Sequence, residues 1–238
     1  MITELSLSDR SKYACALRAS QLVESGMKVG LGTGSTAYWL VHHLAKRVRE
    51  EGLQFVGVPT SQKTRDQALA EGIELISMDE AGRLDITIDG ADEFDQSMNL
   101  IKGGGGAHLQ EKIVAFCSDS MVVIADESKR VNKLGKFPLP VEVLQFGSTS
   151  SQMQIKELLL AHNYKDFSVK MRTVDAKPFI TDEGNYIFDL KLNEIEDQFR
   201  ELTNKFEEVN FKLDKLSARV TKIQSDTQLR LTDIETGN

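Results

Sequence analysis

The chain has 238 residues, of which 40% are hydrophobic, and its 29 basic and 36 acidic residues give a net charge of −7. This length can hold one large domain or two smaller ones around a buried core, and the negative charge argues against a protein that wraps a nucleic-acid backbone. No window approaches the ~18 apolar residues of a membrane span, and the first residues lack the pattern of a signal peptide, so we expect a cytoplasmic protein with neither nucleic acid nor membrane as a partner.

The first 132 residues alternate between helix-like and strand-like patterns. Helical spacing predicts a first helix over Ser8–Ser25, closed by Gly26 as its C-terminal cap. Apolar runs then predict strands at Lys28–Leu31, Gln54–Val58, Glu74–Ile76, Leu84–Ile88 and Met121–Ala125, and amphipathic segments predict helices at Thr36–Arg49, Gln62–Ala70 and Leu109–Phe116. This alternation predicts an α/β fold with a doubly wound, mostly parallel sheet, whose ligand would lie beyond the carboxyl ends of the strands.

The residue pattern changes after residue 132, where two of the four prolines of the chain fall at residues 138 and 140. This change predicts a second domain. The expected elements are a strand at Val141–Leu144, a helix at Gln152–Ala161, a strand at Phe167–Met171, and a hairpin of Pro178–Thr181 with Tyr186–Leu190 joined by residues 182–185. This small α+β domain would span residues 133–193.

Residues 194–238 follow a third pattern. Apolar residues recur at alternating spacings of four and three between Ile195 and Ile223, and the residues between them are almost all polar. A helix over Glu194–Glu235 would be roughly 60 Å long at 1.5 Å per residue, so it would need partner helices. We therefore expect a coiled-coil helix and a homo-oligomer.

The first of three glycine loops, at residues 30–36, leads from a predicted strand into a predicted helix. Its backbone N–H groups and the helix dipole would favour an anion such as phosphate. The segment from Gly32 to Ala37 also fits a G-x-G-x-x-A dinucleotide fingerprint. Because the next strand ends in Pro59, Thr60 and Ser61 rather than in an acid, phosphate binding is the favoured interpretation over a nicotinamide cofactor.

The second loop places two carboxylates after a buried strand. Asp89 ends this strand, and Gly90 lets the chain turn so that Asp89 and Asp92 face a common space. Such a pair can move protons or hold Mg²⁺, and the alternative is a solvated acidic turn that caps a helix. Glu93 and Asp95, which follow, are expected to be surface charges.

The third loop joins a lysine to four glycines. Lys102 precedes the run from Gly103 to Gly106, and such a run lets an oxyanion approach backbone N–H groups beside a positive charge. Glu111 lies nine residues after Lys102, in the first turns of a predicted helix. An early helical Glu is often only a dipole or capping partner, but beside this loop it is predicted to be a general base.

These motifs closely resemble those of type A ribose-5-phosphate isomerases, from about residue 12 to residue 196. The markers are Gly-Leu-Gly-Thr-Gly-Ser-Thr at residues 30–36, Asp-Gly-Ala-Asp-Glu at 89–93, Ile-Lys-Gly-Gly-Gly-Gly at 101–106, Ile-Ala-Asp-Glu-Ser-Lys at 124–129 and Leu-Gly-Lys-Phe-Pro-Leu-Pro-Val-Glu-Val at 134–143. The resemblance implies interconversion of ribose 5-phosphate and ribulose 5-phosphate through an enediolate, in the non-oxidative pentose phosphate pathway, without a metal or other cofactor. Asp89 would help to open the sugar ring, Glu111 would transfer the proton and Lys102 would stabilise the enediolate.

The resemblance also implies a substrate-binding set and an assembly. The residues are Lys12, Thr33, Gly34, Ser35, Thr36, Asp89, Gly90, Ala91, Asp92, Lys102, Gly103, Gly104, Gly105 and Lys129. The family forms dimers or tetramers, whereas residues 198–238 depart from its pattern and resemble the trimerising coiled coil of a periplasmic protein of the Tol system. Two other functions stay open: a sugar-phosphate sensor like those of bacterial repressors, and an inactive isomerase body carried on an oligomerising coiled coil.

Overall fold

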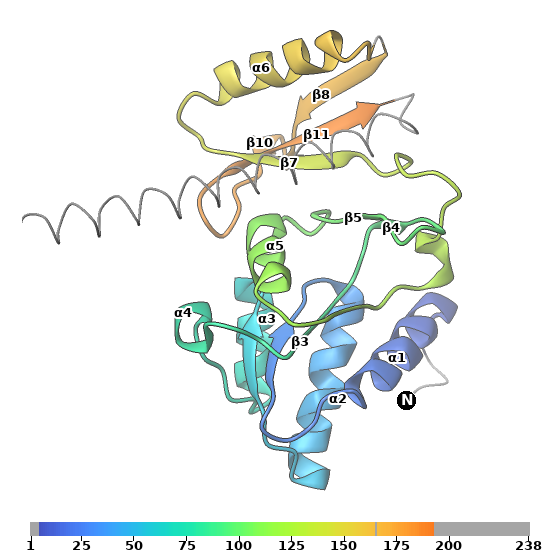
Figure 1. The fold of residues 1–238 in the computed structure, drawn as a ribbon, viewed down its shortest axis with the longest axis vertical. Coiled ribbons are helices and arrows are strands. Elements are labelled where there is room, and N and C mark those ends of the chain that lie inside the picture. Colours follow the sequence, from blue (N-terminus) through green and yellow to red (C-terminus); the bar gives the residue numbers. More distant parts are fainter. Residues whose placement is uncertain (1–4, 165, 193–238) are drawn as a thin grey trace, which may run out of the picture. The chain divides into compact units, whose positions relative to one another are not determined.

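The computed structural model describes residues 5–164 and 166–192, and its larger sheet has four parallel strands (Figure 1). Their order is β2 (Val56–Pro59), β1 (Lys28–Leu31), β3 (Ile86–Asp89) and β6 (Met121–Val123). All three pairings are parallel. The predicted α/β class is therefore confirmed, and the predicted coiled coil at 194–238 lies outside the described residues.

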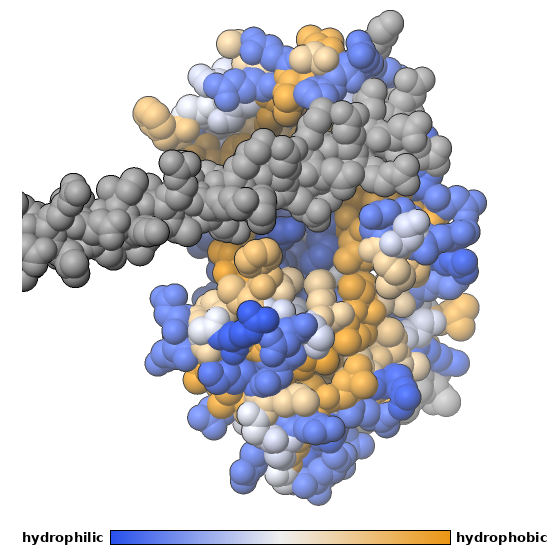
Figure 2. Space-filling view, in the orientation of Figure 1, coloured by the Kyte–Doolittle hydropathy of each residue, from blue (hydrophilic) through white to orange (hydrophobic). Residues whose placement is uncertain are grey.

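Helices cover both faces of this sheet. Alternate residues of β1 point to opposite faces, and each face contacts different helices. Val29 and Leu31 belong to the main hydrophobic core, together with residues of α1 (Leu7–Ser20) and α2 (Ser35–Glu51). A Cβ built on Gly30 would instead lie 2.7 Å from Val114 of α5 (His108–Phe116). Figure 2 shows hydrophobic residues gathered around α5 and the central strands on the face in view.

Local capping explains where several helices begin. Ser6 accepts a hydrogen bond from the N–H of Asp9 at the start of α1, and Ser61 does the same from Thr64 at the start of α3 (Gln62–Ala70). Ser77 and Glu80 form a capping box at α4 (Met78–Ala81), a helix that the sequence patterns did not predict. None of the described helices is long and apolar enough to cross a membrane.

Two predictions for the first domain were wrong in extent. The first helix ends at Ser20, five residues before its predicted end, and Gly26 is not its cap, since the N–H of Gly26 donates to the carbonyl of Gln54. The predicted strand at residues 74–76 is a single parallel bridge between Leu75 and Gly57. Both errors follow from apolar residues that pack against the core without continuing the helix or the strand ladder.

The second sheet is antiparallel, with the order β7 (Leu139–Val143), β11 (Tyr186–Leu192) and β8 (Phe167–Met171), and α6 (Ser148–Ala161) packs against β8. The predicted hairpin of residues 178–181 with 186–190 is wrong. Strand β11 lies between β7 and β8, where its alternating apolar residues are buried. Residues of β10 (Lys177–Pro178) pair with β9 (Thr173–Val174) instead. The predicted domain boundaries at 132/133 and 193/194 stay predictions.

A short hairpin of β4 (Glu93–Phe94) and β5 (Leu100–Ile101) was missed, and with it the role of Glu93. Glu93 is 3% exposed, so the expected surface charge is wrong. Its carboxylate accepts hydrogen bonds from the N–H groups of Gly135 and Phe137, at 2.8 and 2.7 Å. A 3₁₀ turn at Glu127–Lys129 precedes this segment. Glu93 thus fixes the loop that leads into the small sheet.

We predict that Glu93→Ala lowers the free energy of unfolding by about 2–4 kcal/mol, because two backbone donors lose their charged acceptor. Urea denaturation measures the change. Glu50→Ala, which removes an exposed carboxylate paired with Lys46, is the control and should change stability by less than about 0.5 kcal/mol. Equal losses for the two variants would contradict the structural role of Glu93.

Candidate active site

The three glycine loops meet at the carboxyl ends of the strands and enclose a cavity of about 130 Å³. Its lining is formed by Lys12, Thr33, Gly34, Ser35, Thr36, Gly90, Ala91, Asp92, Lys102, Gly103, Gly105, Glu111 and Lys129. Every residue predicted for the site lines it except Asp89 and Gly104, which contact lining residues directly. Segments a hundred positions apart in the sequence therefore converge on one cavity.

Several groups that line the cavity are suited to an anion. The N-cap of α2 is Gly34, which brings no side-chain acceptor, and the N–H groups of Ser35 and Thr36 have no acceptor among the described residues. Lys12 and Lys129 add positive charge to the lining. Backbone donors at a helix N-terminus beside two ammonium groups favour a phosphate.

The N–H and hydroxyl groups of Thr33 are hydrogen-bonded to other residues of the protein. Its N–H donates to Asp89, and its hydroxyl donates to Ser61 at 2.8 Å and lies 2.8 Å from the hydroxyl of Thr60. The hydroxyl of Thr64 donates to the carbonyl of Gly32. These buried hydroxyls at the end of β2 hold the first glycine loop, and the sequence analysis missed them. Polar residues that directly follow a buried strand were the available signal.

Asp89 contacts residues of all three glycine loops. The side chain is 0% exposed, and its Oδ1 accepts hydrogen bonds from the N–H groups of Thr33 and Gly90, at 3.0 and 2.7 Å. Its Oδ2 lies 2.9 Å from Nζ of Lys102. Asp92 acts similarly on the third loop, since its Oδ2 accepts from the N–H of Gly104 at 2.7 Å. Of the predicted pair only Asp92 lines the cavity, and both carboxylates accept hydrogen bonds from backbone N–H groups.

Lys102 lies between two carboxylates. Its Nζ is 2.9 Å from Asp89 and 3.5 Å from Oε1 of Glu111, and it donates to the carbonyl of Gly90 at 2.6 Å. Burial alone would lower the pKa of Lys102, but the two carboxylates outweigh burial and raise this pKa above its ordinary value. The ammonium is therefore a permanent charge at the cavity.

Glu111 has the properties of a base. It is 5% exposed, and burial followed by repulsion from Asp89 raises its pKa to about 7, although Lys102 opposes this rise. Its Oε2 is buried and accepts no hydrogen bond from any residue that the structure describes. A carboxylate with a free oxygen and a pKa near neutrality can accept a proton and return it.

Structural constraints explain most of the glycine run. Gly103 and Gly106 adopt positive φ angles of 98° and 83°, and a Cβ on Gly104 would lie 2.3 Å from Asp92. At Gly105, by contrast, a Cβ would have only an ordinary contact, 3.6 Å from Thr33. Backbone conformation and close packing therefore require glycine at residues 103, 104 and 106, and Gly105 is the member of the run whose surroundings leave room at the cavity.

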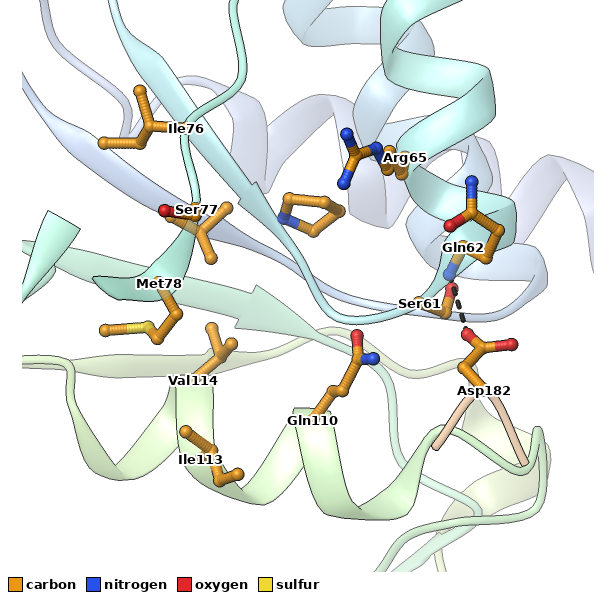
Figure 3. A pocket seen from close by; sticks show the side chains of 12 residues that line it. Ser61, Gln62, Arg65, Ile76, Ser77, Met78, Gln110, Ile113, Val114 and Asp182 are labelled. Carbon is orange, nitrogen blue, oxygen red and sulfur yellow. Dashed lines mark hydrogen bonds between the residues drawn. The ribbon is translucent and has the colours of Figure 1, made fainter. Parts of the chain in front are cut away.

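A second pocket, of about 350 Å³, lies against another side of α5 (Figure 3). Gln110, Ile113 and Val114 face it, and its two charged residues are Arg65 and Asp182. The carboxylate of Asp182 accepts a hydrogen bond from the N–H of Gln62. This pocket has no group of acids and bases like that around Lys102. Among the described residues, no cluster of His, Cys, Asp and Glu could hold a metal ion.

The fold and this site define an α/β protein with a cavity suited to a small anion, next to a cluster of two carboxylates and a lysine. A family model described as ribose 5-phosphate isomerase A (phosphoriboisomerase A) matches residues 56–210. A ribose-5-phosphate isomerase A of Ruegeria sp. strain TM1040 is 57% identical over 195 residues, which cover 82% of this chain and 74% of the relative. The chain belongs to the ribose 5-phosphate isomerase A family.

Two solved structures agree with this assignment. The ribose 5-phosphate isomerase A of Methanocaldococcus jannaschii is 41% identical with a TM-score of 0.73, covering 79% of this chain and 82% of that chain. A further ribose-5-phosphate isomerase, solved in complex with phospho-erythronic acid, is 34% identical with a TM-score of 0.74, covering 82% and 84%.

We predict that Glu111→Gln makes the protein more stable relative to the wild type as pH rises. The pKa of Glu111 in the folded protein, about 7, exceeds its ordinary value of 4.5, so the folded state keeps this proton and its stability falls as pH rises between the two values. From about pH 4.5 to about pH 8 the difference should shift by about 1–3 kcal/mol in favour of the variant. Urea denaturation at both pH values measures it, and Glu50→Gln is the control. A difference that does not change with pH would contradict the raised pKa.

Proposed function

We propose that the cavity interconverts ribose 5-phosphate and ribulose 5-phosphate, with Glu111 as the proton-transferring base. The observation that carries this proposal is the buried Glu111 carboxylate, which has a pKa of about 7 and lies 3.5 Å from Lys102 in a cavity that also contains the start of α2. The cavity thus combines an anion site with a base and a positive charge, which is what isomerisation of a sugar phosphate requires.

The phosphate would bind at the start of α2, with Lys12 and Lys129 beside it. This end of the cavity fixes the sugar chain, so that its carbonyl end reaches Lys102 and Glu111. One solved relative is in complex with phospho-erythronic acid, which combines a phosphate with a carboxylate. An enediolate would carry a negative charge comparable to that of the carboxylate.

The proton transfer balances within the substrate. Glu111 removes the proton from C2 of the open-chain aldose, the C1=C2 enediolate forms, and Glu111 returns the proton to C1. The proton of the C2 hydroxyl moves to the C1 oxygen, which leaves the C2 ketone. Lys102 and the backbone N–H groups of the glycine run stabilise the oxyanion while the proton is on Glu111.

Asp89 would act through Lys102. Since Asp89 is fully buried and does not line the cavity, its contribution to opening the furanose ring is to keep the Lys102 ammonium charged and directed at the ring oxygen. Asp92, which does line the cavity, would contact a sugar hydroxyl.

We predict that Glu111→Gln reduces turnover of ribose 5-phosphate by roughly 10²–10⁴-fold while sugar-phosphate binding is kept, because only the proton acceptor is lost. Ketose formation in the presence of EDTA measures turnover, and calorimetry measures binding. The wild-type kcat/KM should also fall below about pH 7, where Glu111 becomes protonated.

Glu50→Gln is again the control and should turn over normally. If Glu111→Gln is as active as the wild type, Glu111 is not the base. If the wild type binds ribose 5-phosphate without turning it over, a sensor or an inactive isomerase body replaces the proposed enzyme.

We further propose a cytoplasmic homo-oligomer that assembles through the predicted coiled coil of residues 194–238. The heptad spacing of its apolar residues supports this assembly. Phe199→Asp combined with Phe206→Asp should lower the mass measured by light scattering, because charges at two seam positions oppose helix association. An unchanged mass would contradict assembly through this segment.

A further inference from the structure

Arg172 follows β8 in the small sheet, and its side chain makes hydrogen bonds to three residues. Its Nε donates to Oδ2 of Asp189 at 3.0 Å, and its Nη2 donates to Oδ1 of the same carboxylate. Its Nη1 donates to the carbonyls of Gly103 and Gly104, at 2.9 and 3.1 Å. The guanidinium therefore connects the central strand of the small sheet to the glycine run of the cavity.

These contacts fix the orientation of two peptide groups. In a planar trans peptide the C=O and N–H point in opposite directions. The N–H opposite the Gly103 carbonyl belongs to Gly104 and donates to Asp92 at 2.7 Å. The N–H opposite the Gly104 carbonyl belongs to Gly105, which lines the cavity and whose N–H has no acceptor among the described residues. Holding the Gly104 carbonyl on the Arg172 side thus directs the Gly105 N–H away from Arg172.

The charge of Arg172 adds to this effect. A cation that accepts electron density from a carbonyl oxygen polarises the peptide, so its N–H becomes a stronger donor. Asp189 holds the guanidinium in the required plane through two parallel hydrogen bonds, a geometry that a lysine cannot reproduce. Pro140, which is paired with Asp189 across the sheet, packs against the same loop, since a Cβ on Gly103 would lie 3.1 Å from its ring.

We propose that Arg172, oriented by Asp189, is a positioning residue that aims the Gly105 N–H at the developing oxyanion. Glu142 of β7 makes a comparable contact, because its carboxylate accepts a hydrogen bond from the N–H of Leu109 in the first turn of the helix that carries Glu111. The small sheet thereby sets the backbone on both sides of the reacting carbons. This inference rests on the proposed isomerase activity.

The test is Arg172→Ala, assayed for turnover of ribose 5-phosphate. We expect kcat to fall by roughly 10–100-fold, within the range that loss of an oxyanion donor produces, and KM to change by less than about threefold, because the phosphate site is separate. Added guanidinium chloride at about 50 mM should raise kcat of the variant at least about fivefold over an equal concentration of NaCl, since a free guanidinium can occupy the same contacts.

Matched variants separate positioning from general stability. Arg83→Ala removes an exposed Arg that is paired with Asp119, and it should leave kcat unchanged and show no response to guanidinium. Arg172→Lys keeps the charge but loses the planar guanidinium that donates to both Asp189 oxygens, so its kcat should also fall. Asp189→Asn should lower kcat, and its effect should not add to that of Arg172→Ala, because the two residues act as a unit.

The outcomes are distinct. An inactive wild type would refute the proposed function, whereas an active wild type with normal kcat in Arg172→Ala would refute only the positioning role. A loss of kcat that guanidinium does not restore, and that equals the loss of folded protein measured by circular dichroism, would assign Arg172 to stability alone. If Arg172→Ala does not fold, Arg172→Lys and Asp189→Asn decide by the same split between kcat and KM.

Discussion

The site depends on two carboxylates that share one buried ammonium. Asp89 and Glu111 are buried and the side chain of Lys102 is 17% exposed, so the net negative charge of two carboxylates around one ammonium is costly. Lys102 can neutralise only one partner fully, and the shorter contact goes to Asp89. Burial, followed by repulsion from Asp89, raises the pKa of Glu111, and both Oε2 of Glu111 and Oδ2 of Asp89 lack a hydrogen-bond donor among the described residues. The same Asp89 also holds the first and second glycine loops, so the geometry of the cavity and the proton affinity of the base have a common origin.

The two sheets contribute differently to this arrangement. Strands of the parallel sheet end at the cavity and supply loops whose side chains and backbone line it. The antiparallel sheet supplies no lining residue among those described, yet Glu142 and Arg172 both reach backbone groups next to the cavity. The residues that line the cavity would bind the substrate. In the proposed arrangement, residues outside the lining, such as Arg172 and Glu142, fix the direction of the backbone N–H groups through hydrogen bonds.

The sequence allowed the loops and the lining of the cavity to be predicted because those signals are local. Glycine, Ser, Asp and Lys at the ends of apolar runs follow directly from strand, turn and helix-start chemistry, and β8 and α3 have the predicted bounds. What could not be predicted depends on pairing between distant segments. The position of β11 between β7 and β8, the burial of Glu93 under Gly135 and Phe137, and the contact of Arg172 with Gly103 leave no local trace, because each residue alone resembles an ordinary surface charge or edge strand.

The glycine at the start of α2 has a thermodynamic consequence for the whole protein. Of the six described α-helices, α1, α3 and α4 use a serine oxygen for their first N–H groups, whereas α2 begins at Gly34 without a side-chain acceptor. In the proposed complex the substrate phosphate would serve as this N-cap, and any molecule that binds only the folded chain raises its stability, by about 2.7 kcal/mol at a hundredfold excess over Kd. The concentration of the sugar phosphate would thus control both the rate of the reaction and the resistance of the protein to unfolding and proteolysis.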